Sequence, residues 1–314
     1  MKIALTGSSG FMAGSVLSLL EADPEVENVI GIDLKRPEEL FHKLTWVKRD
    51  IRDPLIWQDM QGCEILIHMA FIVLPIHNTA EAMEINVEGS KNVFNAAVKA
   101  GVRKIIHTSS ISVYGAWPDH PIGIKENQPC RGMPNFYYSW SKAKVEEYLD
   151  EFEKEHPTTV VTRLRPSVTL SSKNYSLTKY IVERPFGVKL SNRDTKMQFV
   201  LDEDVAQAIL LAIKNDFGGC FNLSADGFLT GKEVIAMWGK PSVKIPVQLL
   251  YGLVWLAWKL RLKIKFSPEW IKVLEYPIIT DNSKAKSVMG WKPKYDTSQV
   301  LALVLAAINE SKNK

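Results

Sequence analysis

The stretch that decides the fold is residues 2–13, KIALTGSSGFMA. An apolar run of strand character leads into a turn with two glycines, and a helical pattern opens at Ala13. Gly7 permits the tight turn, and Gly10 lets the backbone approach a diphosphate at the positive end of the helix. Ala13 is small enough for that helix to pack on the strand. The spacing predicts a dinucleotide site between the first strand and the first helix.

Outward from this turn, β-rich runs alternate with helical patterns over the first two-thirds of the chain. The strand runs lie at 2–6, 29–33, 45–48, 65–69, 104–109 and 160–165, and helical spacing fills 13–21, 80–100 and 139–155. This alternation predicts an α/β fold with a doubly wound parallel (Rossmann) sheet. We assign residues 1–169 to a dinucleotide-binding domain, to which 199–224 return. Residues 170–198 and 225–314 are expected to form a smaller, mostly helical substrate lobe.

The composition is that of an ordinary folded protein. Of 314 residues, 46% are hydrophobic and 24% charged, which excludes a disordered chain or a disulfide scaffold. A net charge of +4 gives no reason to expect a nucleic-acid partner. Cys63, Cys130 and Cys220 have no paired spacing and no metal motif, so we expect free thiols and no metal. Because a strand begins at residue 2, no signal peptide is expected, and we predict a cytoplasmic protein.

An acidic residue ends the second predicted strand. Asp33 lies twenty residues beyond Ala13, where a carboxylate can accept hydrogen bonds from both hydroxyls of an adenosine ribose. Its charge would repel a 2′-phosphate, which favours NAD over NADP, although Lys35 and Arg36 follow closely and would attract that phosphate. The alternative interpretation of Asp33 is a turn residue at a strand end.

A tyrosine and a lysine are four residues apart near the start of a predicted helix. Tyr138 and Lys142 would share one helix face, and a neighbouring ammonium favours the phenolate. A phenolate in a dry cleft can remove a hydroxyl proton while hydride leaves for a cofactor. Hydroxyl residues at 108–110 end a preceding core strand, where ligands gather. The alternative for the pair is a solvated helix face.

These motifs resemble those of the extended short-chain dehydrogenase/reductase family, also called the NAD-dependent epimerase/dehydratase family. The resemblance rests on the glycine turn, on SISVYG at 110–115, and on the spacing of Tyr138, Ser141, Lys142 and Glu146. It implies that Ser110 is the catalytic hydroxyl, that Tyr138 is the acid or base, and that Lys142 tunes Tyr138 and binds the nicotinamide ribose.

The same resemblance implies NAD contacts along one edge of the sheet. They come from the glycine turn, from segments that follow successive strands, and from the end of the sixth strand. The residues implied are Gly7, Ser9, Gly10, Phe11, Met12, Asp33, Asp50, Ile51, Met69, Ala70, Phe71, Asn86, Thr108, Tyr138, Lys142, Pro166 and Val168. Relatives commonly pair through the helices at 80–100 and 139–155, which implies a homodimer.

The substrate is a small molecule, and the sequence leaves its class open. Only 32 residues separate Pro166 from Phe199, which is short for the insert that holds the nucleotide in sugar-nucleotide epimerases. The substrate could be a nucleotide sugar or a more apolar, sterol-like alcohol. The reaction could be that of an epimerase or of a dehydrogenase. Lys179, Arg184 and Arg193 would grip a diphosphate or form an exposed loop. Ile111 and Ser112 stand where dehydratases of this family carry an acid and a base. A non-catalytic NAD(P)-sensing or scaffold protein is the alternative from another class.

One apolar run calls for a membrane test. Residues 245–260 read IPVQLLYGLVWLAWKL, which is too short for a spanning helix of about 20 residues. The favoured interpretation is a buried helix that lines the substrate cleft or a subunit contact. The alternative is a helix lying in a membrane interface, because lysines and arginine flank the run and two tryptophans lie within it.

Overall fold

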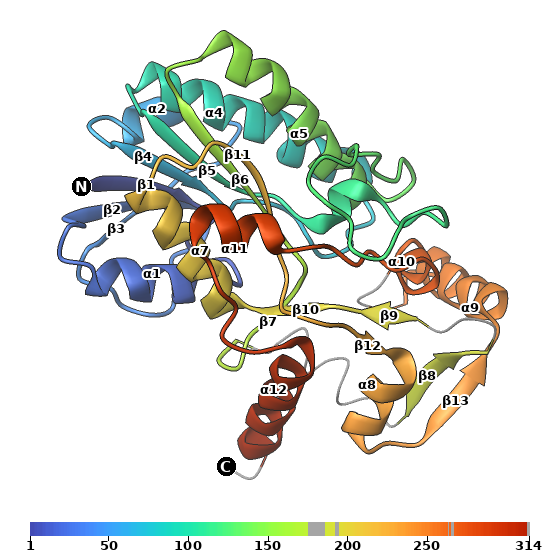
Figure 1. Cartoon of the computed structure of the whole chain (residues 1–314). Helices are drawn as coiled ribbons and strands as arrows, with labels where there is room; N and C mark the ends of the chain where they lie inside the picture. Colours follow the sequence, from blue (N-terminus) through green and yellow to red (C-terminus); the bar gives the residue numbers. More distant parts are fainter. Residues whose placement is uncertain (175–185, 192–194, 263, 265–266, 313–314) are drawn as a thin grey trace.

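The fold is built on one seven-stranded parallel sheet (Figure 1). The computed structural model describes residues 1–174, 186–191, 195–262, 264 and 267–312. The strand order is β11-β6-β5-β4-β1-β2-β3, and each neighbouring pair is parallel. The strands are β1 (Lys2–Thr6), β2 (Asn28–Asp33), β3 (Leu44–Lys48), β4 (Ile65–His68), β5 (Lys104–Thr108), β6 (Val160–Pro166) and β11 (Gly219–Leu223). The predicted doubly wound parallel sheet is therefore confirmed.

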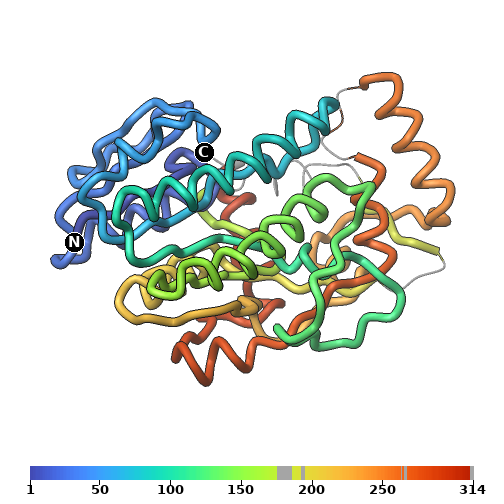
Figure 2. The backbone as a smooth tube through the Cα atoms, turned by 90° about the horizontal axis from the view of Figure 1, so that it is seen from above, coloured from blue at the N-terminus to red at the C-terminus, as the bar shows by residue number. Residues whose placement is uncertain are grey.

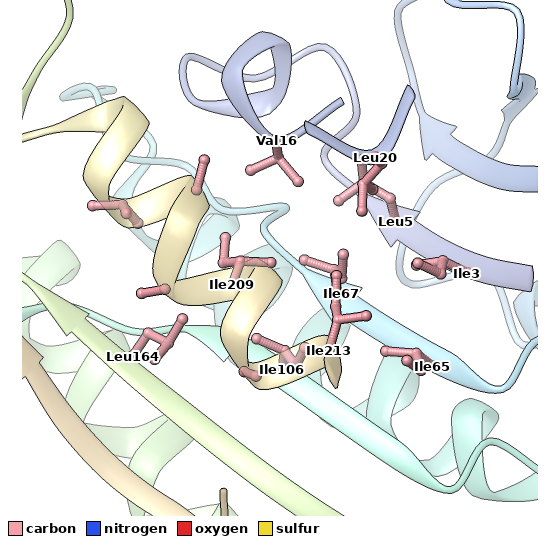
Figure 3. Close-up of a cluster of buried hydrophobic side chains, with 14 of the residues drawn as sticks. Ile3, Leu5, Val16, Leu20, Ile65, Ile67, Ile106, Leu164, Ile209 and Ile213 are labelled. Carbon is pink, nitrogen blue, oxygen red and sulfur yellow. The ribbon is translucent and has the colours of Figure 1, made fainter. Parts of the chain in front are cut away.

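Helices cover both faces of the sheet, as the apolar strands require. On one face lie α1 (Ala13–Ala22), α7 (Asp202–Lys214) and α11 (Ser283–Met289). On the other lie α2 (Ile56–Asp59), α4 (Gly89–Lys99) and α5 (Tyr137–Glu155) (Figure 1). Figure 3 shows Ile3 and Leu5 of β1 turned toward Ile209 and Ile213 of α7, while the intervening Ala4 packs on the opposite face. This alternation of side chains fixes the register of β1 between two helical layers.

The helix predicted at 80–100 is divided. It consists of α3 (Thr79–Met83), a π-helical turn η1 (Glu84–Glu88) and α4. Within the turn, the Ser90 hydroxyl donates to the carbonyl of Asn86 at 2.5 Å, and the Asn86 side chain points to the backbone of Ile72. These side-chain bonds to backbone groups compete with regular helical pairing and account for the extra turn.

Later segments form small sheets and helices beside the carboxyl edge of the main sheet. The strands are β7 (Val168–Leu170), β8 (Gly187–Leu190), β9 (Lys196–Met197), β10 (Phe199–Leu201), β12 (Leu229–Thr230) and β13 (Ser242–Ile245). The helices are a 3-10 turn η2 (Ile111–Tyr114), α8 (Gly231–Trp238), α9 (Val247–Lys259), α10 (Trp270–Glu275) and α12 (Thr297–Lys312). Strand β11 returns to the main sheet beside β6. The division into two lobes at the boundaries given above stays a prediction.

The apolar run at 245–260 forms α9, and the expectation that the chain buries this helix is wrong. Val247 is its buried residue, whereas Leu249, Leu253 and Leu256 are each about half exposed. Figure 2 shows the helix at the periphery of the molecule, where neighbouring elements contact one side only. Among the described residues, no helix combines the length and apolarity needed to cross a bilayer. The three cysteines are free thiols, as expected.

A buried tryptophan ties the C-terminal part of the chain to the main core. Trp291 follows α11, is fully buried, and donates from Nε1 to the carbonyl of Asp204 at 2.8 Å. We expect Trp291→Ala to lower the free energy of unfolding by about 3–5 kcal/mol, because it leaves a cavity. Trp291→Phe should cost about 1 kcal/mol or more, since it loses the hydrogen bond but keeps most of the ring.

Urea unfolding measures both changes. Val288→Ala is the matched control, because Val288 lies on α11 and is 51% exposed. A Trp291→Ala protein as stable as the Val288→Ala protein would show that this anchor is unimportant.

Candidate active site

The glycine turn packs directly against the segment that follows β4. Gly7 has a φ of +76°, which favours glycine, and its amide donates to the carbonyl of Ile32 at 2.9 Å. A Cβ on Gly7 would stand 2.6 Å from the amide nitrogen of Ala70 and 2.8 Å from the carbonyl carbon of Met69. Any side chain here would push the turn and the 69–70 segment apart, so their close packing depends on glycine.

The N-terminus of α1 is free to face an anion. No side chain caps this ten-residue helix, and its first turn holds no acid. Gly10 and Ser9 are exposed, while Phe11 and Met12 are half-buried. The exposed turn therefore presents a positive helix end, which favours an anion, although the Glu39 carboxylate lies near Gly14 in the first turn of the helix.

Asp33 lies at the mouth of this turn. Its Oδ2 accepts from the Ser9 amide at 3.0 Å, and its Oδ1 accepts from the Lys35 amide at 3.1 Å. Each carboxylate oxygen retains a further lone pair for a hydroxyl group. The structure thus brings the acid and the glycine turn together.

The residues implied as adenine contacts have other partners as well. Asp50 forms a two-point ion pair with Arg52, at 2.7 Å and 3.1 Å, and these hydrogen bonds hold the pKa of Asp50 below its ordinary value. Ile51 is buried beneath α4, where a Cβ on Gly89 would lie 2.7 Å from its Cδ1. Contact of Asp50 and Ile51 with a cofactor stays a prediction.

Asn86 holds the segment after β4 in place. Its Oδ1 accepts from the Ile72 amide at 2.7 Å, and its Nδ2 donates to the Ile72 carbonyl at 3.1 Å and the Ser141 hydroxyl at 3.3 Å. Asn86 is fully buried. In this arrangement it positions the segment that contains Ala70 and Phe71, and a direct cofactor contact stays a prediction.

Ser110 and Tyr138 meet at the carboxyl edge of the sheet. Ser110 follows β5 and caps η2, where its Oγ accepts from the Ser112 amide at 3.1 Å. Tyr138 stands in the first turn of α5, and the Ser110 side chain is close enough to its phenol to influence the pKa of that phenol. Ser109 points elsewhere, because its hydroxyl donates to Glu146 at 2.6 Å. Ser110 is therefore the serine placed to share a substrate oxygen with Tyr138.

Lys142 lies one turn further along α5 and is buried. Its Nζ donates to the carbonyl of Thr108 at 2.6 Å and lies 3.6 Å from the centre of the Phe71 ring. Burial lowers the pKa of the Lys142 ammonium to about 7, although the carboxylate of Glu146 opposes this shift. The Thr108 hydroxyl donates to the His68 carbonyl at 3.1 Å, so β5 and β4 together fix the acceptor of Lys142.

In the protein without a cofactor, the pKa of Tyr138 is not lowered as expected. Burial raises the pKa of the Tyr138 phenol above its ordinary value, and the Ser110 side chain opposes that rise. Lys142 does not reverse it, because the buried ammonium is directed to the Thr108 carbonyl. The phenol is thus protonated in the protein alone, and any stabilisation of the phenolate must come from a cation that binds beside it.

A buried carboxylate beneath the site holds α5 on the sheet. Glu146 is 1% exposed and pairs with Arg165 through two contacts of 2.9 Å and with Arg163 at 3.1 Å. Burial alone would raise the pKa of Glu146, but both arginines and the Ser109 hydroxyl outweigh it and lower the pKa to about 2. Arg165 also donates to the Tyr114 hydroxyl at 2.8 Å.

Aromatic rings surround Tyr138. The Phe71 ring meets it edge-on at 5.9 Å, Phe136 lies at 6.0 Å, and Trp270 of α10 stacks on it at 6.3 Å with planes 15° apart. The contact of Trp270 with Tyr138 was not predicted from the sequence. The apolar and aromatic character of the residues before Trp270 was the one sequence feature that pointed toward it. The surroundings of the Tyr138 ring are therefore largely aromatic.

The remaining predicted residues divide into two groups. Pro166 ends β6 and is buried, while Val168 begins β7 and is 49% exposed. Lys179, Arg184 and Arg193, the predicted diphosphate ligands, lie outside the described residues.

The described residues form a cavity elsewhere on the molecule, and they form no metal site. A cavity of about 670 Å³ is lined by residues of α5, β6 and β11, among them Trp140 and Arg163, but not by Tyr138 or Lys142. In the part of the chain that the structure describes, no three His, Cys, Asp or Glu side chains gather closely enough to hold a metal ion.

Comparison with known proteins places this geometry in context. The sequence model of the NAD dependent epimerase/dehydratase family matches residues 3–224. The 3beta-hydroxysteroid-dehydrogenase/decarboxylase isoform 2 of Arabidopsis thaliana is 26% identical over 284 residues, which cover 80% of this chain and 50% of that protein. The N-acetyl-alpha-D-glucosaminyl-diphospho-ditrans,octacis-undecaprenol 4-epimerase of Escherichia coli O157:H7 is 31% identical over 191 residues, 59% of this chain and 55% of that protein.

A solved structure shows the same fold. The dTDP-glucose 4,6-dehydratase DesIV from Streptomyces venezuelae, with NAD and TYD bound, is similar with a TM-score of 0.78. The sequence identity is 19%, and the match covers 100% of this chain and 98% of that one.

Removing the charge of Glu146 tests the buried ion pairs. We expect Glu146→Gln to lower the free energy of unfolding by about 3–5 kcal/mol near neutral pH, because two buried guanidinium groups lose their shared carboxylate. Glu147→Gln is the matched control, since Glu147 is the next residue of α5, is 68% exposed and pairs only with Lys144 among the contacts described.

The pH dependence has a definite sign. The folded pKa of Glu146 is about 2 against an ordinary 4.5, so its ion pairs stabilise the fold fully above pH 4.5 and are lost as pH falls toward 2. The gap between wild type and Glu146→Gln in urea unfolding should therefore narrow below pH 4.5. A gap independent of pH would contradict this account.

Proposed function

Because the chain belongs to the NAD-dependent epimerase/dehydratase family, we propose that it transfers hydride between NAD and a secondary alcohol or its ketone. The observation that carries the proposal is that Ser110, Tyr138 and Lys142 gather at the carboxyl end of β5, where Lys142 donates to the Thr108 carbonyl and Ser110 lies beside the Tyr138 phenol. The same edge of the sheet also holds the glycine turn, and ligands of open α/β sheets bind there.

The residues present fit NAD. The tight glycine turn, which Gly7 allows, and the uncapped N-terminus of α1 suit the diphosphate. Asp33 would hold the adenosine ribose of NAD, and Lys142 would hold the nicotinamide ribose. Bound NAD supplies the hydride acceptor and, when oxidised, a positive charge beside Tyr138.

The proton moves through Tyr138. In the reducing direction, the protonated phenol donates to the oxygen of the substrate as that oxygen gains negative charge, and Ser110 holds the same oxygen. The raised pKa keeps the Tyr138 phenol protonated at neutral pH, the form in which it can donate. In the oxidising direction, Tyr138 would act as its phenolate and accept the proton of the substrate hydroxyl, while Ser110 would hold the same oxygen.

We propose an apolar alcohol as the substrate class, ahead of a nucleotide sugar. The rings of Phe71, Phe136 and Trp270 around Tyr138 support this choice, because they offer contact area but few hydrogen-bonding groups. The names of two relatives point the same way, since one acts on a hydroxysteroid and the other on a sugar linked to undecaprenol. A nucleotide sugar is the second candidate, favoured by the fold shared with DesIV.

Replacement of the phenol tests the reaction. Tyr138→Phe should lower turnover about 10²–10⁴-fold, the usual contribution of a positioned acid or base, while NADH binding stays within a few-fold of wild type. The measurement is NADH formation or consumption with a panel of sterol alcohols, their ketones and UDP-sugars, beside an NADH fluorescence titration.

Tyr148→Phe is the control, because Tyr148 lies on the same helix and donates to Asn95 away from the site. Equal turnover by Tyr138→Phe and wild type would refute the role of Tyr138. Tight NADH binding by a wild type that turns over no member of the panel would favour a cofactor-sensing protein instead.

Asp33 should select NADH over NADPH. We expect NADH to bind at least about tenfold more tightly, a difference of about 1.4 kcal/mol, because a 2′-phosphate would meet the carboxylate. Asp33→Asn should narrow the difference, whereas Asp216→Asn should not, since Asp216 is 75% exposed and pairs with Lys104 at 2.8 Å. A preference of wild type for NADPH would overturn this assignment.

A further inference from the structure

Helix α9 carries an apolar stripe that the chain leaves uncovered. Four leucines recur at intervals of four, three and four residues, which places them on one helix face. They are Leu249, Leu253, Leu256 and Leu260, with exposed fractions of 55%, 53%, 48% and 63%. The opposite face, which includes Leu250 and Val254, is the more buried one. The helix therefore has an inner apolar face that packs and an outer apolar face that does not.

The surroundings of this stripe are positive and aromatic. Residues 234–268 contain six lysines and arginines and no aspartate or glutamate. Trp255 is 46% exposed, and the Nζ of Lys259 lies 4.9 Å from the centre of its ring. Beside the helix, the paired strands β8 and β13 expose Val188 and Val243. Leucines framed by cations and an indole ring are the pattern of a helix that rests in a lipid interface.

We propose that α9 docks this protein on an anionic lipid surface. With 13 residues the helix is too short to span a bilayer, which takes about 20, so it lies along the surface with the leucine stripe among the acyl chains. Lys244, Lys259 and Arg261, at the two ends of the helix, then meet lipid phosphates. Charge also argues against a second copy of the chain as the occupant, because self-pairing would place two acid-free, basic segments against each other.

The docking helix adjoins the segment that borders the active site. Trp258 of α9 stacks on His77 with ring centres 4.1 Å apart. His77 belongs to the same segment as Phe71, and the Tyr137 hydroxyl ties that segment to α5 by donating to the carbonyls of Val73 and Leu74 at 2.9 Å and 2.6 Å. Docking would place the apolar surroundings of Tyr138 close to the lipid. Delivery of an apolar substrate from the bilayer rests on the proposed function, whereas docking itself does not.

Vesicle flotation with the full chain tests the docking. Wild type should float with vesicles of phosphatidylcholine and phosphatidylglycerol in equal amounts, much less with phosphatidylcholine alone, and less at high salt. Leu253→Glu should reduce the bound fraction at least about tenfold, since it puts a charge in the stripe. Val288→Glu is the matched control, because Val288 has a similar exposed fraction, 51% against 53%, and lies on α11.

Vesicle flotation and NADH binding together distinguish a loss of docking from a loss of the active site. Leu253→Glu should bind NADH as wild type does, which shows that it is folded, and Tyr138→Phe should float as wild type does. Failure of wild type to float with the anionic vesicles overturns the proposal, as does equal flotation of Leu253→Glu. A change in solution mass with Leu253→Glu would assign the stripe to a subunit contact instead. The homodimer expected through α4 and α5 involves other helices and should persist in this variant.

Discussion

The buried carboxylate of Glu146, shared between Arg163 and Arg165, is the interaction on which the site depends. It joins α5 to β6 across the helical layer, with the Ser109 hydroxyl as a third partner. Helix α5 also carries Tyr138 and Lys142, so the orientation of the helix decides whether the phenol meets Ser110. A buried ion pair is weak evidence for stability by itself, because desolvation offsets much of the Coulomb attraction. Its geometric effect is the stronger one, since two arginines on one strand accept a single placement of the carboxylate.

Lys142 and Asn86 are held in place by groups at the ends of neighbouring strands. The lysine reaches the end of β5, and the asparagine holds the segment after β4. Because all neighbouring strands are parallel, their carboxyl ends meet at one edge, and the glycine turn after β1 lies at that same edge. Hydroxyl groups, an amine and a helix N-terminus that are far apart in the chain thereby come to border one crevice.

Much of the fold was predictable because it depends on interactions between residues that are close together in the sequence. Ile3 and Leu5 alternate with Ala4, and both sets of side chains are apolar, which indicates a strand covered on two faces. Gly7, Gly10 and Asp33 have spacings that a single βαβ unit imposes. The approach of Trp270 to Tyr138 was beyond the sequence, since it depends on how a segment 130 residues later folds back. The raised pKa of Tyr138 was missed for a similar reason, because desolvation depends on packing that spacing alone does not specify.

The exposure of α9 within the chain was not foreseen, because an apolar composition does not tell whether the chain itself, a second subunit or a lipid surface covers the helix. A core helix and a lipid-facing helix share leucines and tryptophans. What separates them is the tertiary partner on the outer side, and within this chain that side of α9 has none among the described residues. The flanking cations distinguish the two cases better than the leucines do, since a core helix has little use for them.

The bridge between Glu146 and two later arginines has a consequence for the order of events at the ribosome. When residue 155 has just been made, α5 is complete, but the arginines that neutralise its inner carboxylate are still to be added. Docking the helix at that moment would bury an unpaired charge at a cost of several kcal/mol. Stable docking of this helix therefore requires β6, so Tyr138 and Lys142 are held in place only after residue 165 has been made.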